Sequence, residues 1–294
     1  MAHAKQARWG QERRLEFIDF RLYWEGRVNR SDLIEYFGIS VPQASLDLSK
    51  YQELAPHNSR YDLSEKAYVA TEDFKPIIAA SSAHAYLDQV LGLELGILQP
   101  NSSFLGSPPS AAAVKDPSRS VSPSTLRAVL QAIRSQSKLE ITYQSMSRAV
   151  PTARTISPHA IAFDGFRWHV RAYCHERQDF RDFLFARILE IVSGDRSPID
   201  PTTDAVWQRE VEAIIVPQPS LTEAQRRAIE LDYGMEGGRL VIKTREALFL
   251  YLLEHLGLLH KPDIRAASDQ QIVLANRDAL KPFFVSHGMG DDQQ

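Results

Sequence analysis

One segment of the chain separates two regions that differ in hydrophobic patterning. Residues 100–124 are rich in Pro, Ser and Ala, and they contain few large apolar side chains. Helical spacing of apolar residues dominates before this segment, and alternation typical of strands follows it. Such a composition is typical of a linker or a partly ordered connector. The sequence therefore predicts a multidomain α+β protein, in keeping with the two or three domains that 294 residues suggest.

The first 70 residues contain a succession of short helical patterns. Leu15, Ile18, Leu22 and Tyr23 are spaced as one apolar stripe of a helix, which Gly26 is expected to end. This first helix would supply the apolar surface on which the following shorter helices pack.

Capping residues mark two further helices. Asn29 is expected to cap a helix over residues 30–37, with Asp32 at an early helical position and Gly38 as the C-terminal stop. A third helix is predicted to start after Ser40, with Gln43 completing a capping box. Residues 72–98 also look helical.

Two short helices joined by a tight glycine turn, with a probable hairpin over residues 58–69, are typical of a winged helix-turn-helix. Such a domain places the first turn of its second helix in the DNA major groove, where Gln43 could pair with adenine. The alternative is that Gln43 only caps its own helix, and this shape also occurs in proteins that never touch DNA. The residues predicted to contact DNA are Ser40, Val41, Pro42, Gln43, Ser45, Lys50, Arg60 and Tyr61.

Overall composition limits the classes of partner and compartment. The formal net charge is −3 and the pI is about 6.3, so DNA binding would depend on a local surface doubled in a dimer. Cys174 is a single cysteine, which excludes an internal disulfide and suits a reducing cytoplasm. Neither a secretory signal nor an apolar run of about 18 residues is evident, so we expect a cytoplasmic protein without a membrane partner.

The region from residue 138 to residue 192 is predicted to be rich in strands. Leu139, Ile141 and Tyr143 share one face if their run is extended. Asp164 and Gly165 form a strong hairpin turn signal between two such runs. The pattern predicts a sheet whose buried face carries the alternating apolar residues.

The strand after this turn has two different faces. Trp168, Val170 and Ala172 share one face, and we expect Trp168 and Val170 to belong to the core. His169 and Arg171 lie on the opposite face. That polar face is the place where a ligand could bind.

Arginine, hydroxyl and imidazole groups together suit a phosphate or a nucleic-acid fragment, and aromatic neighbours could stack bases. The alternative is that Arg171 and Arg187 pair with Asp179, Asp182 or Glu190 and only stabilise the fold. Cys174 beside His175 is a weak signal for catalysis, because adjacent strand residues point to opposite faces. The predicted ligand-binding residues are Tyr143, Ser145, His159, His169, Arg171 and Arg187.

Two resemblances to known families follow from these motifs. The run FGISVPQASLDLSKYQEL at residues 37–54 resembles the recognition part of the winged helices in DeoR-like regulators. The second half resembles a WYL domain, although Trp168-His169-Val170 stands where that family has Trp-Tyr-Leu. The WYL motifs, in the family's order, are ITY at 141–143, Arg154 with SPH at 157–159, GFRWHV at 165–170, AYC at 172–174 and RDFLFARI at 181–188.

The WYL resemblance implies a small Sm/SH3-like β-barrel that senses a ligand, followed by a small α+β extension called WCX. The whole architecture resembles WYL repressors of the BrxR/CapW type, which are homodimers that repress phage-defence operons. The expected domains are a winged helix-turn-helix at 1–71, a helical connector and linker at 72–123, the WYL domain at 124–196 and the WCX-like domain at 204–294.

The leading hypothesis is a homodimeric repressor that binds an inverted-repeat operator and responds to a nucleotide or a single-stranded nucleic-acid effector. One alternative is a ligand-dependent activator of the same build, and another is a nucleotide-processing enzyme. Phosphate-cradling GxxxxGK[ST], HExxH and CxxC motifs do not occur, so we expect no cofactor, no metal and no catalysis.

Overall fold

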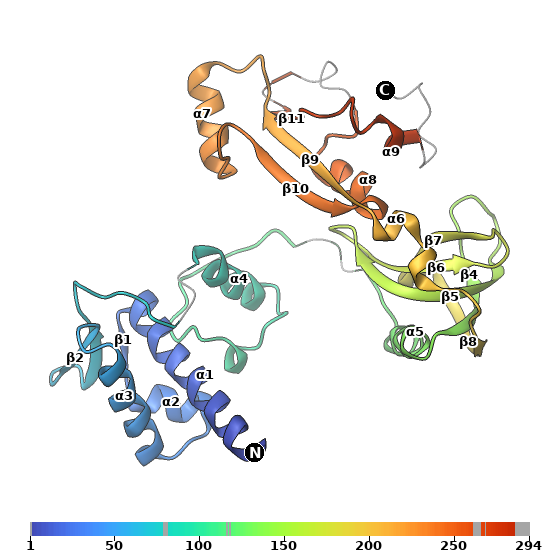
Figure 1. Ribbon diagram of the computed structural model, residues 1–294. Coiled ribbons are helices and arrows are strands. Elements are labelled where there is room, and N and C mark those ends of the chain that lie inside the picture. Colours follow the sequence, from blue (N-terminus) through green and yellow to red (C-terminus); the bar gives the residue numbers. More distant parts are fainter. Residues whose placement is uncertain are drawn as a thin grey trace. The chain divides into compact units, whose positions relative to one another are not determined.

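The computed structural model describes residues 2–78, 82–115, 117, 119–260, 266–267 and 269–285. The chain forms two compact units, Met1–Asp116 and Pro117–Gln294 (Figure 1). None of the helices in these ranges has the length and apolar character that crossing a membrane requires. Each unit is described separately.

The first unit is a winged helix-turn-helix followed by a connector, as predicted. Three antiparallel strands form a small sheet in the order β1-β3-β2, and the β2–β3 hairpin is the wing. Its elements are α1 (Ala2–Glu25), β1 (Arg27–Val28), α2 (Arg30–Phe37), α3 (Val41–Leu54), β2 (Ser59–Asp62), β3 (Ala67–Ala70), α4 (Ala83–Glu94) and η1 (Pro100–Ser102).

Local capping explains where α2 and α3 begin and end. Asn29 and Asp32 form a complete capping box on α2, and Gly38 ends that helix in the left-handed region at φ 63°. Ser40 accepts a hydrogen bond from the backbone amide of Gln43 at the start of α3. The prediction that Gln43 completes a capping box is wrong, because its side chain donates to Asp47 instead.

Part of the Pro- and Ser-rich segment packs into the first unit. Phe104 and Leu105 are buried, and the Phe104 ring lies 5.2 Å from that of Phe17 and 5.7 Å from that of Phe20. The ring of Tyr36 completes this aromatic cluster at 5.3 Å. Phe104 and Leu105 therefore belong to the helical core, although the composition around them is that of a linker.

The second unit begins with one helix against a five-stranded antiparallel sheet. The strand order is β7-β6-β5-β4-β8, and β7 and β8 do not pair within the described residues. The sheet is therefore open, whereas the WYL resemblance implied a small Sm/SH3-like β-barrel. Val129 and Ala132 of the helix pack on the buried face. The elements are α5 (Pro123–Ser135), β4 (Ser137–Tyr143), β5 (Thr152–Phe163), β6 (Trp168–Cys174), β7 (Asp179–Leu184), η2 (Phe185–Arg187) and β8 (Ile188–Arg196).

The β5–β6 hairpin turns at Asp164 and Gly165, as predicted, and Gly165 has φ 97°. Val170 and Ala172 are fully buried on the core face. Trp168 is 46% exposed, so the expectation that it belongs to the core is wrong. It is the first residue of β6, next to the turn, and its ring lies against that of Phe163.

A linker and a small α+β domain complete the second unit. Three antiparallel strands form a sheet in the order β10-β9-β11, and α8 packs against β9 and β10. Phe249 and Leu253 of that helix are fully buried against Ile215 of β9. The elements are η3 (Pro201–Thr203), α6 (Ala205–Gln208), β9 (Glu210–Pro217), α7 (Glu223–Asp232), β10 (Leu240–Arg245), α8 (Glu246–His255), β11 (Ile272–Leu274) and α9 (Lys281–Val285).

Candidate functional site

The first turn of α3 is exposed on the surface of the first unit. Val41 is 54% exposed and Leu46 is 63% exposed, and Pro42 also faces solvent. The opposite face of α3 is buried through Ala44 and Leu48. This arrangement leaves the N-terminal half of α3 accessible to a large partner.

The side chain of Gln43 is held in position by a buried carboxylate. Gln43 Nε2 donates to Asp47 at 3.1 Å and 3.2 Å from the two carboxylate oxygens. Arg14 of α1 donates two hydrogen bonds to the same carboxylate, from Nε to Oδ2 at 2.6 Å and from Nη2 to Oδ1 at 3.3 Å. The amide of Gln43 is therefore fixed at the helix surface, with its oxygen left to accept a hydrogen bond.

The other predicted DNA-contact residues lie along α3 and the wing. Ser45 is half-buried and donates to the carbonyl of Val41. Lys50 is exposed and pairs with Glu53 at 2.9 Å. In the wing, Arg60 pairs with Asp62 at 3.5 Å, and Tyr61 is exposed with its ring against Tyr68. The predicted residues thus share the first unit, with positive charge confined to Lys50 and Arg60 among the eight.

The second unit contains a cavity of about 820 Å³ between the five-stranded sheet, the linker and α8. Cavities of about 300–1,000 Å³ are typical of small-molecule sites. Five arginines and three aspartates are among its lining residues: Arg148, Arg154, Arg171, Arg177, Arg181, Asp179, Asp182 and Asp204. Within the described part of the chain, Arg148 and Arg177 form no ion pair, so the cavity has positive charge to offer.

Three of the predicted ligand-binding residues line this cavity, namely Tyr143, Ser145 and Arg171. The Tyr143 hydroxyl accepts a hydrogen bond from the backbone amide of Leu184 at 3.2 Å. Arg187 lies in η2 and does not line the cavity, and His159 and His169 also stand outside its wall.

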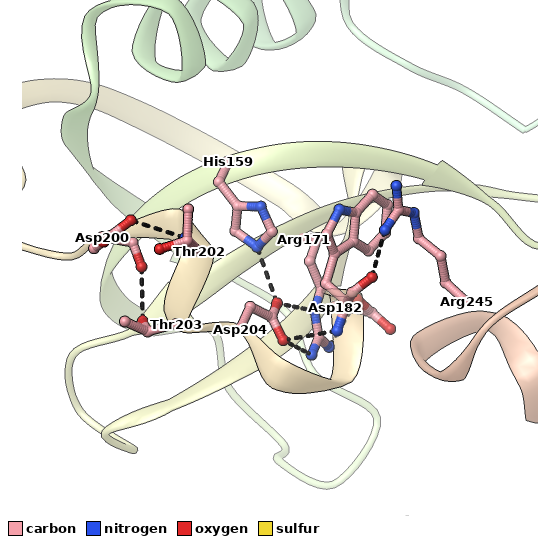
Figure 2. A network of polar contacts seen from close by, with 9 residues as sticks. His159, Arg171, Asp182, Asp200, Thr202, Thr203, Asp204 and Arg245 are labelled. Carbon is pink, nitrogen blue, oxygen red and sulfur yellow. Dashed lines mark hydrogen bonds and ion pairs between the residues drawn. The ribbon is translucent and has the colours of Figure 1, made fainter. Parts of the chain in front are cut away.

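Arg171 makes three hydrogen bonds with two carboxylates of the cavity wall. Its Nε donates to Asp204 Oδ2 at 2.8 Å and its Nη2 to Asp204 Oδ1 at 2.9 Å (Figure 2). Its Nη1 donates to Asp182 Oδ1 at 3.3 Å. The expected alternative of structural pairing with Asp182 is therefore observed, and Asp204, which was not among the expected partners, completes it.

Asp204 holds the linker against the sheet. Its side chain is 1% exposed, and His159 Nε2 lies 3.0 Å from Oδ2. Burial by itself raises the pKa of this carboxyl group, but the hydrogen bonds from His159 and Arg171 outweigh burial and hold its pKa well below the usual range. Asp204 is therefore ionised at neutral pH.

The C-terminal domain reaches the same network through α8. Tyr251 donates to Asp182 Oδ2 at 3.2 Å, and its ring lies 5.1 Å from that of His169. Burial, followed by the negative charge of Asp182, raises the pKa of Tyr251, so the phenol stays protonated. His169 Nε2 lies 2.8 Å from Asp164 Oδ2, which explains why this histidine faces the junction rather than the cavity.

Sequence reasoning missed several members of the cavity wall. Arg154 belongs to one of the WYL motifs. Arg177 lies in the β6–β7 turn and Arg181 lies on β7 just after it, so a count of arginines around that turn could have indicated these two. Asp204 and Tyr251 gave no signal, because each meets the sheet from a distant part of the chain. No group of three potential metal ligands occurs in the described ranges.

A winged helix followed by a sheet with an arginine-lined cavity and a small α+β domain defines the class of WYL-domain regulators. Three family models match in this order: the BrxR transcriptional regulator winged helix-turn-helix domain at residues 10–92, the WYL domain at 124–193 and the BrxR transcriptional regulator C-terminal dimerization domain at 210–280.

Similar proteins cover nearly the whole chain. The DNA-binding transcriptional repressor CapW of Stenotrophomonas maltophilia is 44% identical over 95% of this chain and 93% of that protein. CapW of Pseudomonas aeruginosa is 45% identical over 94% of this chain and 92% of its own length. The chain therefore belongs to the BrxR/CapW family of WYL-domain transcriptional regulators.

Proposed function

We propose that this chain represses transcription as a homodimer that binds an inverted-repeat operator, and that a phosphorylated ligand in the cavity lowers its affinity for that DNA. The ligand class is a nucleotide or a fragment of nucleic acid, and the regulated genes form a phage-defence operon. The observation that carries the proposal is the pairing of an exposed recognition helix with an arginine-lined cavity in a chain of this family.

The DNA-binding part rests on α3 and on the family. The relatives are named DNA-binding transcriptional repressors, and the first turn of α3 is free to enter a major groove. The net charge of −3 gives the chain no overall attraction to DNA, so binding depends on local basic surfaces. A dimer has two such surfaces, and their phosphate contacts add up. Two-fold symmetry requires an operator with two inverted half-sites.

The ligand part rests on the charge of the cavity. Arginine forks match the geometry of phosphate oxygens, and the unpaired Arg148 and Arg177 would each gain a charged partner. Phe180 in the same wall gives a base a ring to stack on.

The DNA-binding part is tested by a mobility-shift assay on the DNA directly upstream of the gene. Gln43→Ala should weaken operator binding about 2- to 12-fold, the range of about 0.5–1.5 kcal/mol for the single hydrogen bond that its side-chain oxygen is left to accept. Gln52→Ala is the matched control, because Gln52 is the other glutamine of α3 and lies near its C-terminal end. Equal binding by both variants would remove Gln43 from the interface, and no shift by the wild-type protein would refute DNA binding.

The ligand part is tested by adding a short 5′-phosphorylated single-stranded oligonucleotide to the complex of protein and operator. We expect release of the DNA and, by reciprocal coupling, weaker oligonucleotide binding by the DNA-bound protein. Oligonucleotide affinities that are equal with and without operator would contradict ligand control.

A further inference from the structure

Arg171, the arginine of the cavity whose guanidinium could bind an anionic ligand, is already bound to the carboxylate of Asp204. Both carboxylate oxygens of Asp204 accept hydrogen bonds from Arg171, and Asp182 accepts a third at 3.3 Å. All three side chains line the cavity, so the guanidinium donors of Arg171 are already bound to the protein's own carboxylates (Figure 2). A phosphate that binds Arg171 has to compete with them.

Asp204 lies in the linker between the sheet and the C-terminal domain. Its Oδ1 also accepts a hydrogen bond from the backbone amide of Trp207 in α6. Arg245, at the start of α8, donates to the carbonyl of Trp207 and places its guanidinium 4.7 Å from the centre of the Trp207 ring. A change at Asp204 therefore reaches the C-terminal domain through two residues.

The second carboxylate makes the same connection from the other side. Asp182 on β7 accepts from both Arg171 and Tyr251, and Tyr251 belongs to α8. Arg171 is thus the common point of two contacts that fasten the C-terminal domain to the sheet. A ligand that binds the guanidinium of Arg171 therefore affects both the contact through Asp204 and the contact through Asp182.

We propose that Asp204 is an internal competitor for the ligand: a phosphorylated ligand binds Arg171 by displacing the Asp204 carboxylate, and this displacement frees the linker and loosens the C-terminal domain from the sheet. The inference rests on the proposed function, because it describes how ligand binding at that cavity reaches the rest of the chain. The C-terminal family model is described as a dimerization domain, which makes this junction a suitable place for control.

The exchange is physically reasonable because it replaces one anion by another. Removing a partner from a buried ion pair is costly, but a phosphate supplies acceptor oxygens and negative charge to Arg171 in place of Asp204. The free Arg148 and Arg177 favour the phosphate further, since Asp204 does not reach them in this structure. The displaced Asp204 gains solvent, in which its ionised form is stable.

The test measures binding of inorganic pyrophosphate to the full-length protein by calorimetry. Asp204→Asn removes the competing charge and keeps a side chain that can still cap α6, so it should tighten pyrophosphate binding about tenfold or more. Asp200→Asn is the matched control, because Asp200 lies in the same linker, caps η3 and does not line the cavity. We expect its affinity to stay within about twofold of the wild type, as its charge is exposed and screened.

Hydrogen exchange on the wild-type protein tests the same point without a substitution. Saturating pyrophosphate should raise the exchange rate of the Trp207 and Gln208 amides, which are bonded to Asp204 in its present position. The amide of Leu184, bonded to Tyr143 within the sheet, should be unaffected.

The outcomes separate the two proposals. If the wild type binds pyrophosphate, and Asp204→Asn and Asp200→Asn bind it equally, displacement of Asp204 is wrong while ligand binding stands. Unchanged exchange at Trp207 in the saturated protein would likewise contradict the displacement alone. If neither the wild type nor Asp204→Asn binds pyrophosphate or the oligonucleotide, both the displacement of Asp204 and the ligand part of the proposed function are wrong. Binding by Asp204→Asn alone supports the competition.

Discussion

In each of the two units, the guanidinium of an arginine donates two hydrogen bonds to the carboxylate of a buried aspartate. In the winged helix, Arg14 binds Asp47 at 2.6 Å and 3.3 Å, and in the second unit Arg171 binds Asp204 at 2.8 Å and 2.9 Å. The carboxylate side chains are 0% and 1% exposed. The chemistry of the two pairs is therefore nearly the same.

Their surroundings differ. The pair of Arg14 and Asp47 joins two packed helices, α1 and α3, and its other hydrogen-bond donor is Gln43. The pair of Arg171 and Asp204 lies in the wall of the 820 Å³ cavity beside further arginines. Under the proposed displacement, the ion pair of Arg171 and Asp204 is exchangeable because it lines a cavity with room for another anion, whereas the pair of Arg14 and Asp47 stays closed and fastens α1 to α3.

The largest expected loss of stability comes from breaking the buried ion pair of Arg14 and Asp47, and an exposed ion pair serves as the comparison. Arg14→Met leaves Asp47 buried with Gln43 as a neutral donor, and it should lower the free energy of unfolding of the first unit by about 3 kcal/mol. Urea unfolding followed by tryptophan fluorescence measures this, because Trp24 lies in that unit. Lys50→Gln breaks an exposed pair and should cost at most about 0.5 kcal/mol. Equal losses in the two variants would show that the Arg14 pair does not stabilise the fold.

Acid should weaken the second unit through its two most strongly held carboxylates. Burial by itself raises the pKa of Asp164 and Asp204. Hydrogen bonds, first those from His169 to Asp164 and from His159 to Asp204, lower the two pKa values by more than burial raises them, so both end below the usual value. A lowered folded pKa stabilises the protein above the unfolded value of about 3.9, and this contribution is lost as pH falls below it. The slope is about 1.4 kcal/mol per pH unit for each carboxylate.

Urea unfolding of the wild type and of Asp204→Asn between pH 4 and about pH 2.5 checks this effect. The variant should lose less stability per pH unit than the wild type, because it lacks one of the two groups that take up a proton on unfolding. Parallel pH profiles for the two proteins would contradict the assignment.

Local chemistry explains what the sequence could predict. The caps at Asn29 and Gly38 and the turn at Asp164 and Gly165 depend on residues within a few positions of each other, so their signals are complete in the sequence. Alternation likewise placed Leu139 on the buried face of β4. The family resemblance supplied the order of the domains.

Long-range pairing explains what the sequence could not predict. Barrel closure requires β7 to pair with β8, and alternation within each strand says nothing about which edges meet. Arg171 was identified as a candidate, but its partner Asp204 lies 33 residues away in a linker. The cavity is formed by the sheet, the linker and α8 together, so no single segment of the sequence could indicate it.

A smaller effect is expected where the C-terminal domain touches the network. Tyr251→Phe removes the hydrogen bond to Asp182 and keeps the ring beside His169, so it should cost about 1 kcal/mol in the unfolding of the second unit. Asp182 keeps its bond to Arg171, which limits the loss. Tyr173→Phe is the control, since its ring packs on Phe180 and its hydroxyl has no hydrogen bond within the described residues. Thermal unfolding should separate the two variants, and coincident curves would contradict a role for the Tyr251 hydroxyl.

The smallest effect is expected at Cys174, which lines the same cavity as Arg171 without holding a charge. Burial raises the pKa of its thiol, and its Sγ donates weakly to Glu176 at 3.4 Å. Cys174→Ser keeps a donor of similar size, so the free energy of unfolding should change by less than about 1 kcal/mol.

Because the chain has a single cysteine, iodoacetamide labelling followed by mass spectrometry reads this thiol alone. Labelling in the native protein at pH 7.5 should be much slower than in urea, since a protonated, buried thiol is a poor nucleophile. Rapid native labelling would show that the cavity wall opens at this position.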